Sequence, residues 1–418
     1  MGLLDPPALT PKSAAATYVT GGNRIPVCER VYPPYFNPGS LSDGTKQGVA
    51  WRSKYPVMNS GHSLKISYSN FQNTSSKGED DGPNAVTLYA AIESASGAVP
   101  IPITPVGGVL IQPGETKTFD VGMSVKAGDI LWVRTQLSVA TLGQKWSYGN
   151  PLIWPGEGVL DTSASPTVDI TKSALTTDFV YTGGYPWGPS AITAVHEGAR
   201  LPSVLVVGTS IAWGIGNTSD ASKSWINQPL IAAGIPFQSF AIGGSTGAQF
   251  NALEKRYRRM ILSYGLRHTH AIWEHWVNDR ANGFAANQTM SITGWRILSD
   301  IGMKVWGSTG IVTTNAANTV TDAANANRIS YNTWMRDGAP LNPTTFAAVA
   351  TGTAGSSTVV RFGQAGHPAV GYFEVADIAE SARDSGFWKS GYTTDGVHPT
   401  TAGHNAMAAA IDTSVFTV

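Results

Sequence analysis

Four short segments of the sequence carry the residue types that acyl transfer requires. They are Gly208-Thr209-Ser210, "AIGGSTG" at 241–247, "HWVNDR" at 275–280 and "TTDGVHPTTAGH" at 393–404. A serine hydroxyl is a weak nucleophile until a base removes its proton, and histidine suits that role near neutral pH. A carboxylate must orient the imidazole, and hydrogen-bond donors must lie where the oxyanion forms.

Each part of this chemistry has a candidate residue. Ser210 is the candidate nucleophile and His398 is the candidate base. Asp395 lies three residues before the histidine on the same short loop, where its carboxylate can hold the imidazole in one tautomer. Gly244 offers a backbone N–H that no side chain obstructs, and Asn278 offers a side-chain amide.

The elements between these segments must bring them together. Apolar runs alternate with helix-length segments, which predicts a parallel sheet with helices on both faces and right-handed crossovers. The predicted strands are 203–207, 236–242, 269–277, 303–308 and 369–375, and the predicted helices are 222–233, 247–264, 287–302, 321–337 and 400–411. Ligands bind beyond the carboxyl ends of the strands in such sheets, which is where the four segments fall. Segment 340–368 interrupts the alternation and is expected to be an inserted loop or hairpin.

The four segments resemble the sequence blocks of the SGNH, or GDSL-type, hydrolases over roughly residues 200–418. This resemblance implies a three-layer α/β/α, flavodoxin-like domain with a parallel sheet and an esterase activity. The implied catalytic residues are Ser210, His398 and Asp395, and the implied oxyanion hole consists of Ser210, Gly244 and Asn278. Two positions depart from the family pattern: Thr209 replaces its usual aspartate, and Trp276 replaces its usual glycine and is expected to narrow or shape the cleft.

A second serine offers an alternative nucleophile. Residues 243–247 match G-x-S-x-G, the nucleophile elbow of the α/β-hydrolases, with Ser245 at its centre. Only one predicted strand, 203–207, precedes the strand that leads into this motif, and no histidine-glycine oxyanion motif precedes it. That fold also separates its acid and its histidine widely, so the sequence favours Ser210.

Other residues near the motifs have simpler explanations. Three histidines, His268, His270 and His275, could suggest a zinc site. Strand alternation divides them between two faces of the sheet, and the zinc-binding motif H-E-x-x-H is absent from the sequence. Trp213, Trp276 and Trp388 flank the motifs, either as core residues or, if exposed, as platforms for a sugar ring. Each site residue alone also has a structural explanation, Ser210 as a helix cap and Asp395 as a turn residue.

The first half of the chain has a different rhythm. Short runs rich in Val, Ile, Tyr and Thr alternate with turn signals, which predicts an all-β, jelly-roll-like sandwich over 20–190. Residues 1–19 are expected to be an N-terminal extension, and 196–418 the hydrolase-like domain. The β-rich half also resembles the β-domain that precedes the hydrolase domain in some secreted members of the family.

The totals exclude several classes of protein. The 418 residues contain 28 Lys and Arg and 28 Asp and Glu, so no strong field attracts nucleic acid or an anionic membrane. The single cysteine, Cys28, excludes an intramolecular disulfide and a cysteine metal cluster. The first 18 residues lack the features of a signal peptide, and no stretch approaches a membrane span. The composition nevertheless suggests an extracellular or virion-associated protein.

The sequence therefore predicts a serine esterase with no cofactor and no metal. The expected substrate is a small acyl ester, most plausibly acetyl, on a carbohydrate. The prediction of a carbohydrate substrate is based on the predicted sandwich, the tryptophans and the absence of an apolar lid segment. The alternative is a binding protein, such as a virion or cell-surface adhesin, whose hydrolase-like half does not turn over. Oligomeric state is not predicted.

Overall fold

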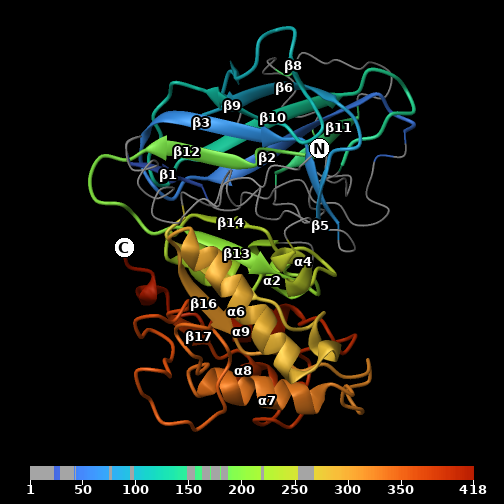
Figure 1. The fold of residues 1–418 in the computed structure, drawn as a ribbon. Coiled ribbons are helices and arrows are strands. Elements are labelled where there is room, and N and C mark those ends of the chain that lie inside the picture. The colour runs from blue at the N-terminus through green and yellow to red at the C-terminus, as the bar shows by residue number, and fades with distance from the viewer. Residues whose placement is uncertain are drawn as a thin grey trace, which may run out of the picture.

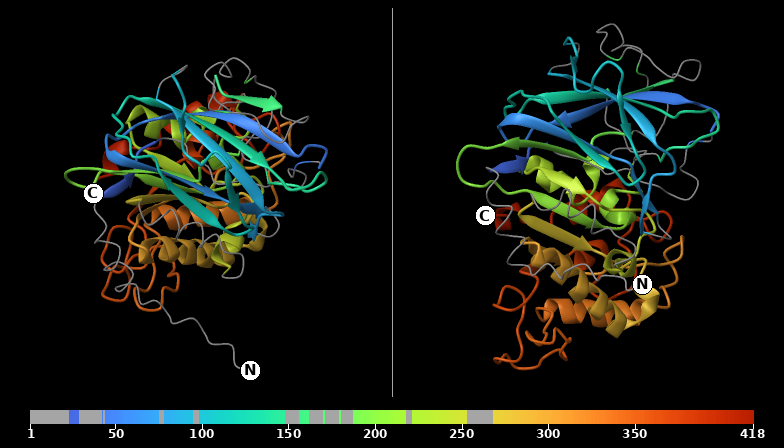
Figure 2. Two further views of the ribbon diagram at one scale, coloured as in Figure 1. Left: turned by 90° about the horizontal axis from the view of Figure 1, so that it is seen from above. Right: turned by 45° about the horizontal axis from the view of Figure 1, so that its top comes forward.

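The structure is a computed structural model that describes residues 23–28, 42, 44–74, 78–94, 98–147, 156–161, 170, 179, 187–217, 221–252 and 268–418. Two antiparallel sheets form the part of the molecule drawn at the top of Figure 1, and a parallel sheet with its helices forms the lower part. The further views in Figure 2 show the same two parts in contact. The expected extension 1–19 lies outside the described residues.

The first half forms two larger antiparallel sheets and a hairpin. The four-stranded sheet has the order β1 (Arg24–Pro26), β12 (Ala191–Val195), β3 (His62–Ser69), β9 (Thr116–Asp120). The other has the order β11 (Gly158–Asp161), β2 (Gly48–Pro56), β10 (Ile130–Ser138), β6 (Val86–Glu93), β7 (Ile101–Pro102), and β8 (Val109–Ile111) also pairs with β6. The hairpin consists of β4 (Phe71–Thr74) and β5 (Gly78–Asp81).

The two larger sheets share one apolar core. Side chains alternate along β3, so that Leu64 and Ile66 point inward between half-buried neighbours. They join Leu88 of β6 and Val133 of β10 in the same buried cluster. The antiparallel region continues through β12 to Val195, beyond the expected limit at 190. A jelly-roll connection of these strands stays a prediction.

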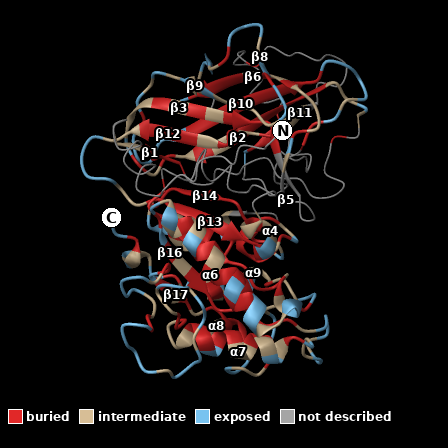
Figure 3. Ribbon diagram, viewed as in Figure 1, coloured by how far each residue is buried: buried red, intermediate tan, exposed pale blue. Residues whose placement is uncertain are grey.

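The second half contains a five-stranded sheet in which every pair is parallel. Its order is β14 (Phe237–Ser239), β13 (Val204–Gly208), β15 (His270–Glu274), β16 (Lys304–Ser308), β17 (Gly371–Phe373). In chain order this is 2-1-3-4-5, the flavodoxin-like arrangement. β13, β14 and β15 are buried along their whole length, as the red ribbons of Figure 3 show for β13 and β14. The predicted parallel α/β sheet is therefore correct.

Helices and short turns connect these strands. They are α2 (Ser210–Trp213), η2 (Ala221–Lys223), α3 (Asn227–Ala232), α4 (Gly247–Asn251), η5 (Arg280–Asn282), α6 (Phe284–Asp300), α7 (Asn325–Arg336), α8 (Ala376–Ala379), α9 (Thr401–Ala408) and η6 (Thr413–Val415). α6 packs against β15, β16, α4 and α7, whereas α9 packs against α3 and α8. Within the described ranges, no helix is both long and apolar enough to cross a membrane.

Two predicted helices differ from the structure. The helix expected over 222–233 is divided into η2 and α3. Pro229 lacks an N–H and is tolerated only in the first turn of a helix, so α3 begins at Asn227. The helix expected over 247–264 ends at Asn251, because Ala252 is extended with φ −69° and ψ 124°. Residues 253–264 of that prediction lie outside the described part of the chain.

Segment 340–368 contains isolated bridges but no named helix or strand. Leu341 pairs with both Ala348 and Val360. The segment packs on α6 and α7, where Phe362 contacts Trp295 edge-on with ring centroids 5.5 Å apart. It connects the end of α7 to the start of β17 and therefore lies at the amino edge of the parallel sheet. The sequence motifs lie at the opposite, carboxyl edge.

Contacts between the two halves cover the edge strand β14. Phe71 of β4 is 2 % exposed and belongs to the apolar core of the α/β half. Gln238 of β14 donates its side-chain N–H to the carbonyl of Ser190 and pairs through Oε1 with His268 Nε2 at 3.2 Å. An uncovered edge strand would offer unpaired backbone groups to other chains, and this contact protects it.

Phe71→Ala is expected to lower the free energy of unfolding of the α/β half by about 3–5 kcal/mol, the usual cost of truncating a buried phenylalanine. Phe119→Ala is the matched control, because Phe119 is only half-buried beside the antiparallel core. Urea denaturation followed by tryptophan fluorescence measures both variants. An equal loss for the two would contradict the placement of Phe71 in the α/β core.

Candidate active site

Ser210 lies where β13 passes into α2. The strand ends at Gly208, and Thr209 is extended at φ −102° and ψ −167°, with its hydroxyl accepting the Ile211 N–H as the helix cap. Ser210 is the first helical residue and is 5 % exposed. The strand order reverses between β13 and β15, and this switch point is where flavodoxin-like sheets bind ligands.

The structure brings Ser210, His398 and Asp395 into one hydrogen-bonded chain. Ser210 Oγ lies 2.9 Å from His398 Nε2. His398 Nδ1 lies 2.6 Å from Asp395 Oδ2. Because an ionised carboxylate can only accept, Nδ1 carries the proton and Nε2 is left to accept the serine hydroxyl proton. This is the orientation in which an imidazole acts as a general base.

Hydrogen bonds keep Asp395 ionised. Burial opposes ionisation, but the bonds from the His398 imidazole and from the His398 and Val397 N–H groups outweigh it and lower the pKa of the carboxyl group. The two backbone bonds, of 2.7 and 2.8 Å, both end on Asp395 Oδ1. One carboxylate oxygen therefore shapes the loop while the other orients the imidazole.

The loop that carries His398 is also fixed from outside. Gly396 has φ +82°, and a Cβ there would lie 2.3 Å from the carbonyl oxygen of Thr314. The Gly396 carbonyl accepts hydrogen bonds from Thr314 N at 2.8 Å and from the Trp388 indole at 3.1 Å. Only glycine fits this close approach, so the sequence Asp-Gly-Val-His serves the conformation of the loop as well as its chemistry.

Three hydrogen-bond donors lie in the segments that follow β13, β14 and β15. Neither the Ser210 N–H nor the Gly244 N–H has an acceptor in the part of the chain that is described. Gly244 is exposed and has φ +76°. Asn278 Nδ2 donates one proton to the Ser245 carbonyl at 2.7 Å, which leaves its second N–H for a ligand.

Ser245 lacks the surroundings of a nucleophile. Its side chain is 1 % exposed, and its hydroxyl bonds to the carbonyl oxygens of Ile242 at 2.9 Å and Gly208 at 3.1 Å. Both partners are backbone carbonyl oxygens, which accept a hydrogen bond but are too weakly basic to remove the proton. The hydroxyl instead ties the turn that carries Gly244 to the strand end that precedes Ser210.

The three histidines suggested for zinc are buried and do not share a site. His268 bonds to Gln238, and His270 Nδ1 lies 2.8 Å from Thr269 Oγ1. Burial lowers the pKa of His270 to about 4 and that of His275 to about 3. Among the residues with described positions, no group of three or more His, Cys, Asp or Glu side chains is arranged to hold a metal ion.

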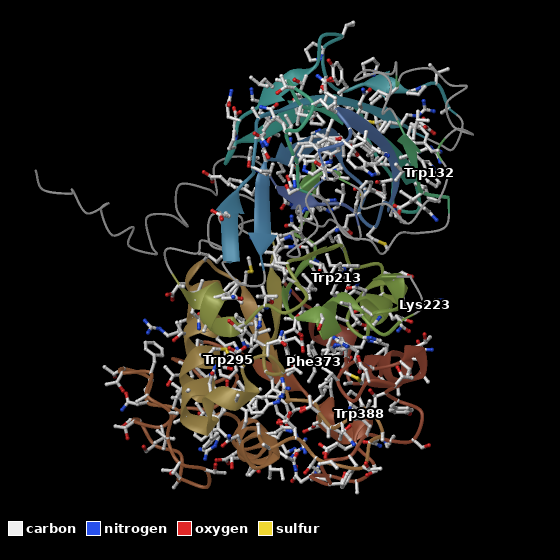
Figure 4. All side chains as sticks on the ribbon, turned by 90° about the vertical axis from the view of Figure 1, so that its right-hand side faces the viewer. Trp132, Trp213, Lys223, Trp295, Phe373 and Trp388 are labelled. Carbon is white, nitrogen blue, oxygen red and sulfur yellow. The ribbon has the colours of Figure 1, made fainter. Side chains whose placement is uncertain are left out.

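The tryptophans near the motifs belong to the core. Trp213, Trp276 and Trp388 are each at most 3 % exposed, and Figure 4 shows Trp213 and Trp388 inside the α/β half. Trp276 stacks on Tyr331 with ring centroids 4.9 Å apart, and a Cβ on Gly310 would lie 2.6 Å from its ring. These side chains are too buried to stack on a sugar, and a role for Trp276 in shaping the cleft stays a prediction.

Two buried carboxyl groups near the site were not predicted from the sequence. Glu274 accepts hydrogen bonds from Thr209, and Asp279 Oδ2 accepts the Gly247 N–H at 2.9 Å. Burial raises the pKa of Glu274 to about 7 and that of Asp279 to about 6. Acidic residues at the end of the apolar strand "AIWE" were the available signal, because a carboxyl group there needs buried partners.

His404 of α9 was also missed. Its Nδ1 accepts the Trp225 N–H at 3.3 Å, and its Nε2 donates to the Ile215 carbonyl at 3.0 Å. The Ile215 N–H in turn donates to the Ser210 carbonyl at 2.9 Å. His404 therefore ties the helix that follows His398 to the turn that carries Ser210.

The sequence matches no protein-family model and no curated protein. The chain is similar to solved structures of a GDSL-like lipase from Bacteroides thetaiotaomicron (14 % identity, TM-score 0.34, 51 % of this chain and 87 % of that one) and an esterase from Pseudoalteromonas (15 %, 0.33, 50 % and 93 %). It is also similar to a lipolytic G-D-S-L family protein from Veillonella parvula (13 %, 0.34, 50 % and 94 %). The Bacteroides and Veillonella proteins are described as GDSL-type, the class whose sequence blocks the motifs resemble.

Glu274→Gln is expected to change how stability depends on pH. The folded pKa of about 7 exceeds the ordinary value of 4.5, so the folded state holds this proton after the unfolded state has released it. Wild-type stability should therefore fall as pH rises from about 4.5 to about 7, by on the order of 3 kcal/mol from this group. Urea unfolding at a series of pH values measures the slope. An unaltered slope in the glutamine variant would contradict a protonated Glu274.

Proposed function

We propose that this chain is a serine ester hydrolase that acts through a covalent acyl-enzyme. Ser210 is the nucleophile, His398 the general base and acid, and Asp395 the group that orients the imidazole. The observation that carries the proposal is the continuous hydrogen-bonded chain from Asp395 Oδ2 to Ser210 Oγ, with distances of 2.6 and 2.9 Å, at the switch point of a parallel sheet.

The acylation step follows from the tautomer that Asp395 imposes. His398 Nε2 takes the hydroxyl proton as Ser210 Oγ attacks the ester carbonyl carbon. The carbonyl oxygen becomes an oxyanion, which the N–H groups of Ser210, Gly244 and Asn278 are free to bind. The carbon–oxygen bond to the leaving alcohol then breaks, and His398 returns its proton to the departing alkoxide.

Deacylation uses the same groups with water in place of the alcohol. His398 Nε2 takes a proton from water, and the resulting hydroxide attacks the acyl carbon. The bond to Ser210 Oγ breaks, Oγ recovers the proton from His398, and the carboxylic acid leaves. The His398 side chain is 24 % exposed, which allows water to reach it.

A small acyl ester is the proposed substrate, with an acetylated carbohydrate as its most specific form. The antiparallel half packs on the α/β half through Phe71 and through the Gln238–Ser190 hydrogen bond, and it is the part of the chain proposed to bind a polymeric alcohol. Because the tryptophans are buried, they give no support to a sugar as the alcohol. Rates on p-nitrophenyl esters of increasing chain length, beside acetylated polysaccharides, test the acyl and alcohol parts separately.

Ser210→Ala is expected to reduce ester hydrolysis by several orders of magnitude, the usual cost of losing such a nucleophile. Ser245→Ala is the matched control and should keep most of the turnover, because its hydroxyl bonds only to carbonyl oxygens. Initial rates on p-nitrophenyl acetate compare the two. An active Ser210 variant beside an inactive Ser245 variant would refute the proposed nucleophile, and turnover by neither variant nor wild type would favour a binding protein.

Asn278→Ala should lower kcat by roughly 10²–10³, the scale found for one oxyanion donor. KM should change far less, because the donor acts mainly on charge that develops in the transition state. Steady-state kinetics on the same ester separate the two constants, and the thermal midpoint checks folding. An effect confined to KM would show that Asn278 binds substrate without stabilising the oxyanion.

A further inference from the structure

Glu274 bonds twice to the residue that precedes the proposed nucleophile. Its Oε2 accepts the Thr209 N–H and the Thr209 hydroxyl proton, each at 2.9 Å. The glutamate is 6 % exposed, and no Lys, Arg or His pairs with it in the described chain. Asp279 is the charged neighbour that acts on it, and it disfavours ionisation of Glu274. Hydrogen bonding, rather than an ion pair, therefore holds this contact.

The sheet register places the glutamate beside the end of β13. Gly208 pairs with Glu274 across the parallel strands. A Cβ at Gly208 would lie 2.7 Å from Glu274 Oε2 and 2.7 Å from the Ala212 Cβ. Glycine at this position leaves the space that the carboxyl group occupies. The conformation of the turn and the position of the carboxyl group thus depend on each other.

The Thr209 hydroxyl connects the glutamate to the first turn of α2. It donates its proton to Glu274 and accepts the Ile211 N–H at 3.3 Å. A hydroxyl group has one proton and two lone pairs, so both bonds form together. Valine at 209 would lose both bonds, whereas serine would keep them.

We propose that Glu274 is a positioning residue, whose carboxyl group fixes the turn at Thr209 and thereby places Ser210 Oγ against His398 Nε2. The positioning role of Glu274 rests on the proposed esterase function only for the expected change in kcat. The Ser210–His398 hydrogen bond is a structural property and can be observed whether or not an ester is cleaved. Because hydrogen bonding carries the contact, glutamine should replace glutamate and leucine should not.

The first experiment compares Glu274→Gln with Glu274→Leu in the full chain, using p-nitrophenyl acetate. Displacement of a reacting group by about 1 Å costs up to roughly 100-fold in rate, so we expect kcat of the leucine variant to fall about 10- to 100-fold with little change in KM. The glutamine variant should stay within about threefold of wild type, since its amide oxygen accepts the same two bonds from Thr209 and only the further bond from the Ala212 N–H is lost. Ile66→Ala, in the separate antiparallel core, controls for a general loss of stability.

A second pair of variants covers the case in which Glu274→Leu does not fold. Thr209→Val should lower kcat in the same way as the leucine variant, and Thr209→Ser should retain it. The ¹⁵N resonances of the His398 imidazole, measured by NMR in all four variants, report whether Nε2 still accepts the Ser210 hydrogen bond. We expect that signature to be lost in the leucine and valine variants and kept in the other two.

Some outcomes would overturn the positioning role. One is a folded Glu274→Leu or Thr209→Val protein with wild-type kcat and an unaltered His398 spectrum. Another is a Glu274→Gln protein as impaired as the leucine variant, which would assign the effect to charge. A wild type that cleaves no ester would refute the proposed function alone, because the NMR comparison still decides whether Glu274 positions Ser210.

Discussion

The hydrogen bond between Ser210 Oγ and His398 Nε2 joins residues 188 positions apart, and its 2.9 Å length constrains the chain between them. The sheet must bring the end of β13 to the switch point, and the last loop must return to the same edge. That loop is fixed by Asp395, which accepts two of its N–H groups, and by Gly396, which packs on Thr314. His404 adds a second link between α9 and the Ser210 turn. The proposed chemistry depends on this agreement between distant segments.

β15 and the residues after it hold the other parts of the site in register. Glu274 fixes Thr209, Asn278 bonds to the Ser245 carbonyl, and Asp279 bonds to the first N–H of α4. Residues 274–279 thus bond to the turn after β13 and to the turn after β14. Burial of two carboxyl groups without cations is costly, and in natural proteins such features concentrate where geometry matters for function.

Much of the fold and of the candidate site could be predicted from the sequence because the signals are local. A short apolar run followed by a small or polar residue marks a strand end, and parallel strands bring their carboxyl ends to one edge. Ser210, Gly244 and Asn278 follow this rule, whereas His398 lies in the loop before α9 and was found from the Asp-x-x-His-Pro spacing. The prediction of one helix over 222–233 was wrong, because Pro229 can lie only in the first turn of a helix and therefore sets where α3 begins. Glu274 was missed because its burial at the end of β15 depends on hydrogen bonds to Thr209 at the end of another strand, which no local pattern encodes.

Segment 340–368 lies at the edge of the parallel sheet opposite to the candidate active site. The segment joins α7 to β17 at the amino edge of the sheet and packs on Trp295 and the neighbouring helices, whereas the reactive groups occupy the carboxyl edge. Changes in this loop are therefore expected to act on the amino edge of the sheet and not on the residues around Ser210. The loop is therefore a suitable attachment point for a label or an immobilising tether, because it lies at the edge of the sheet opposite to Ser210.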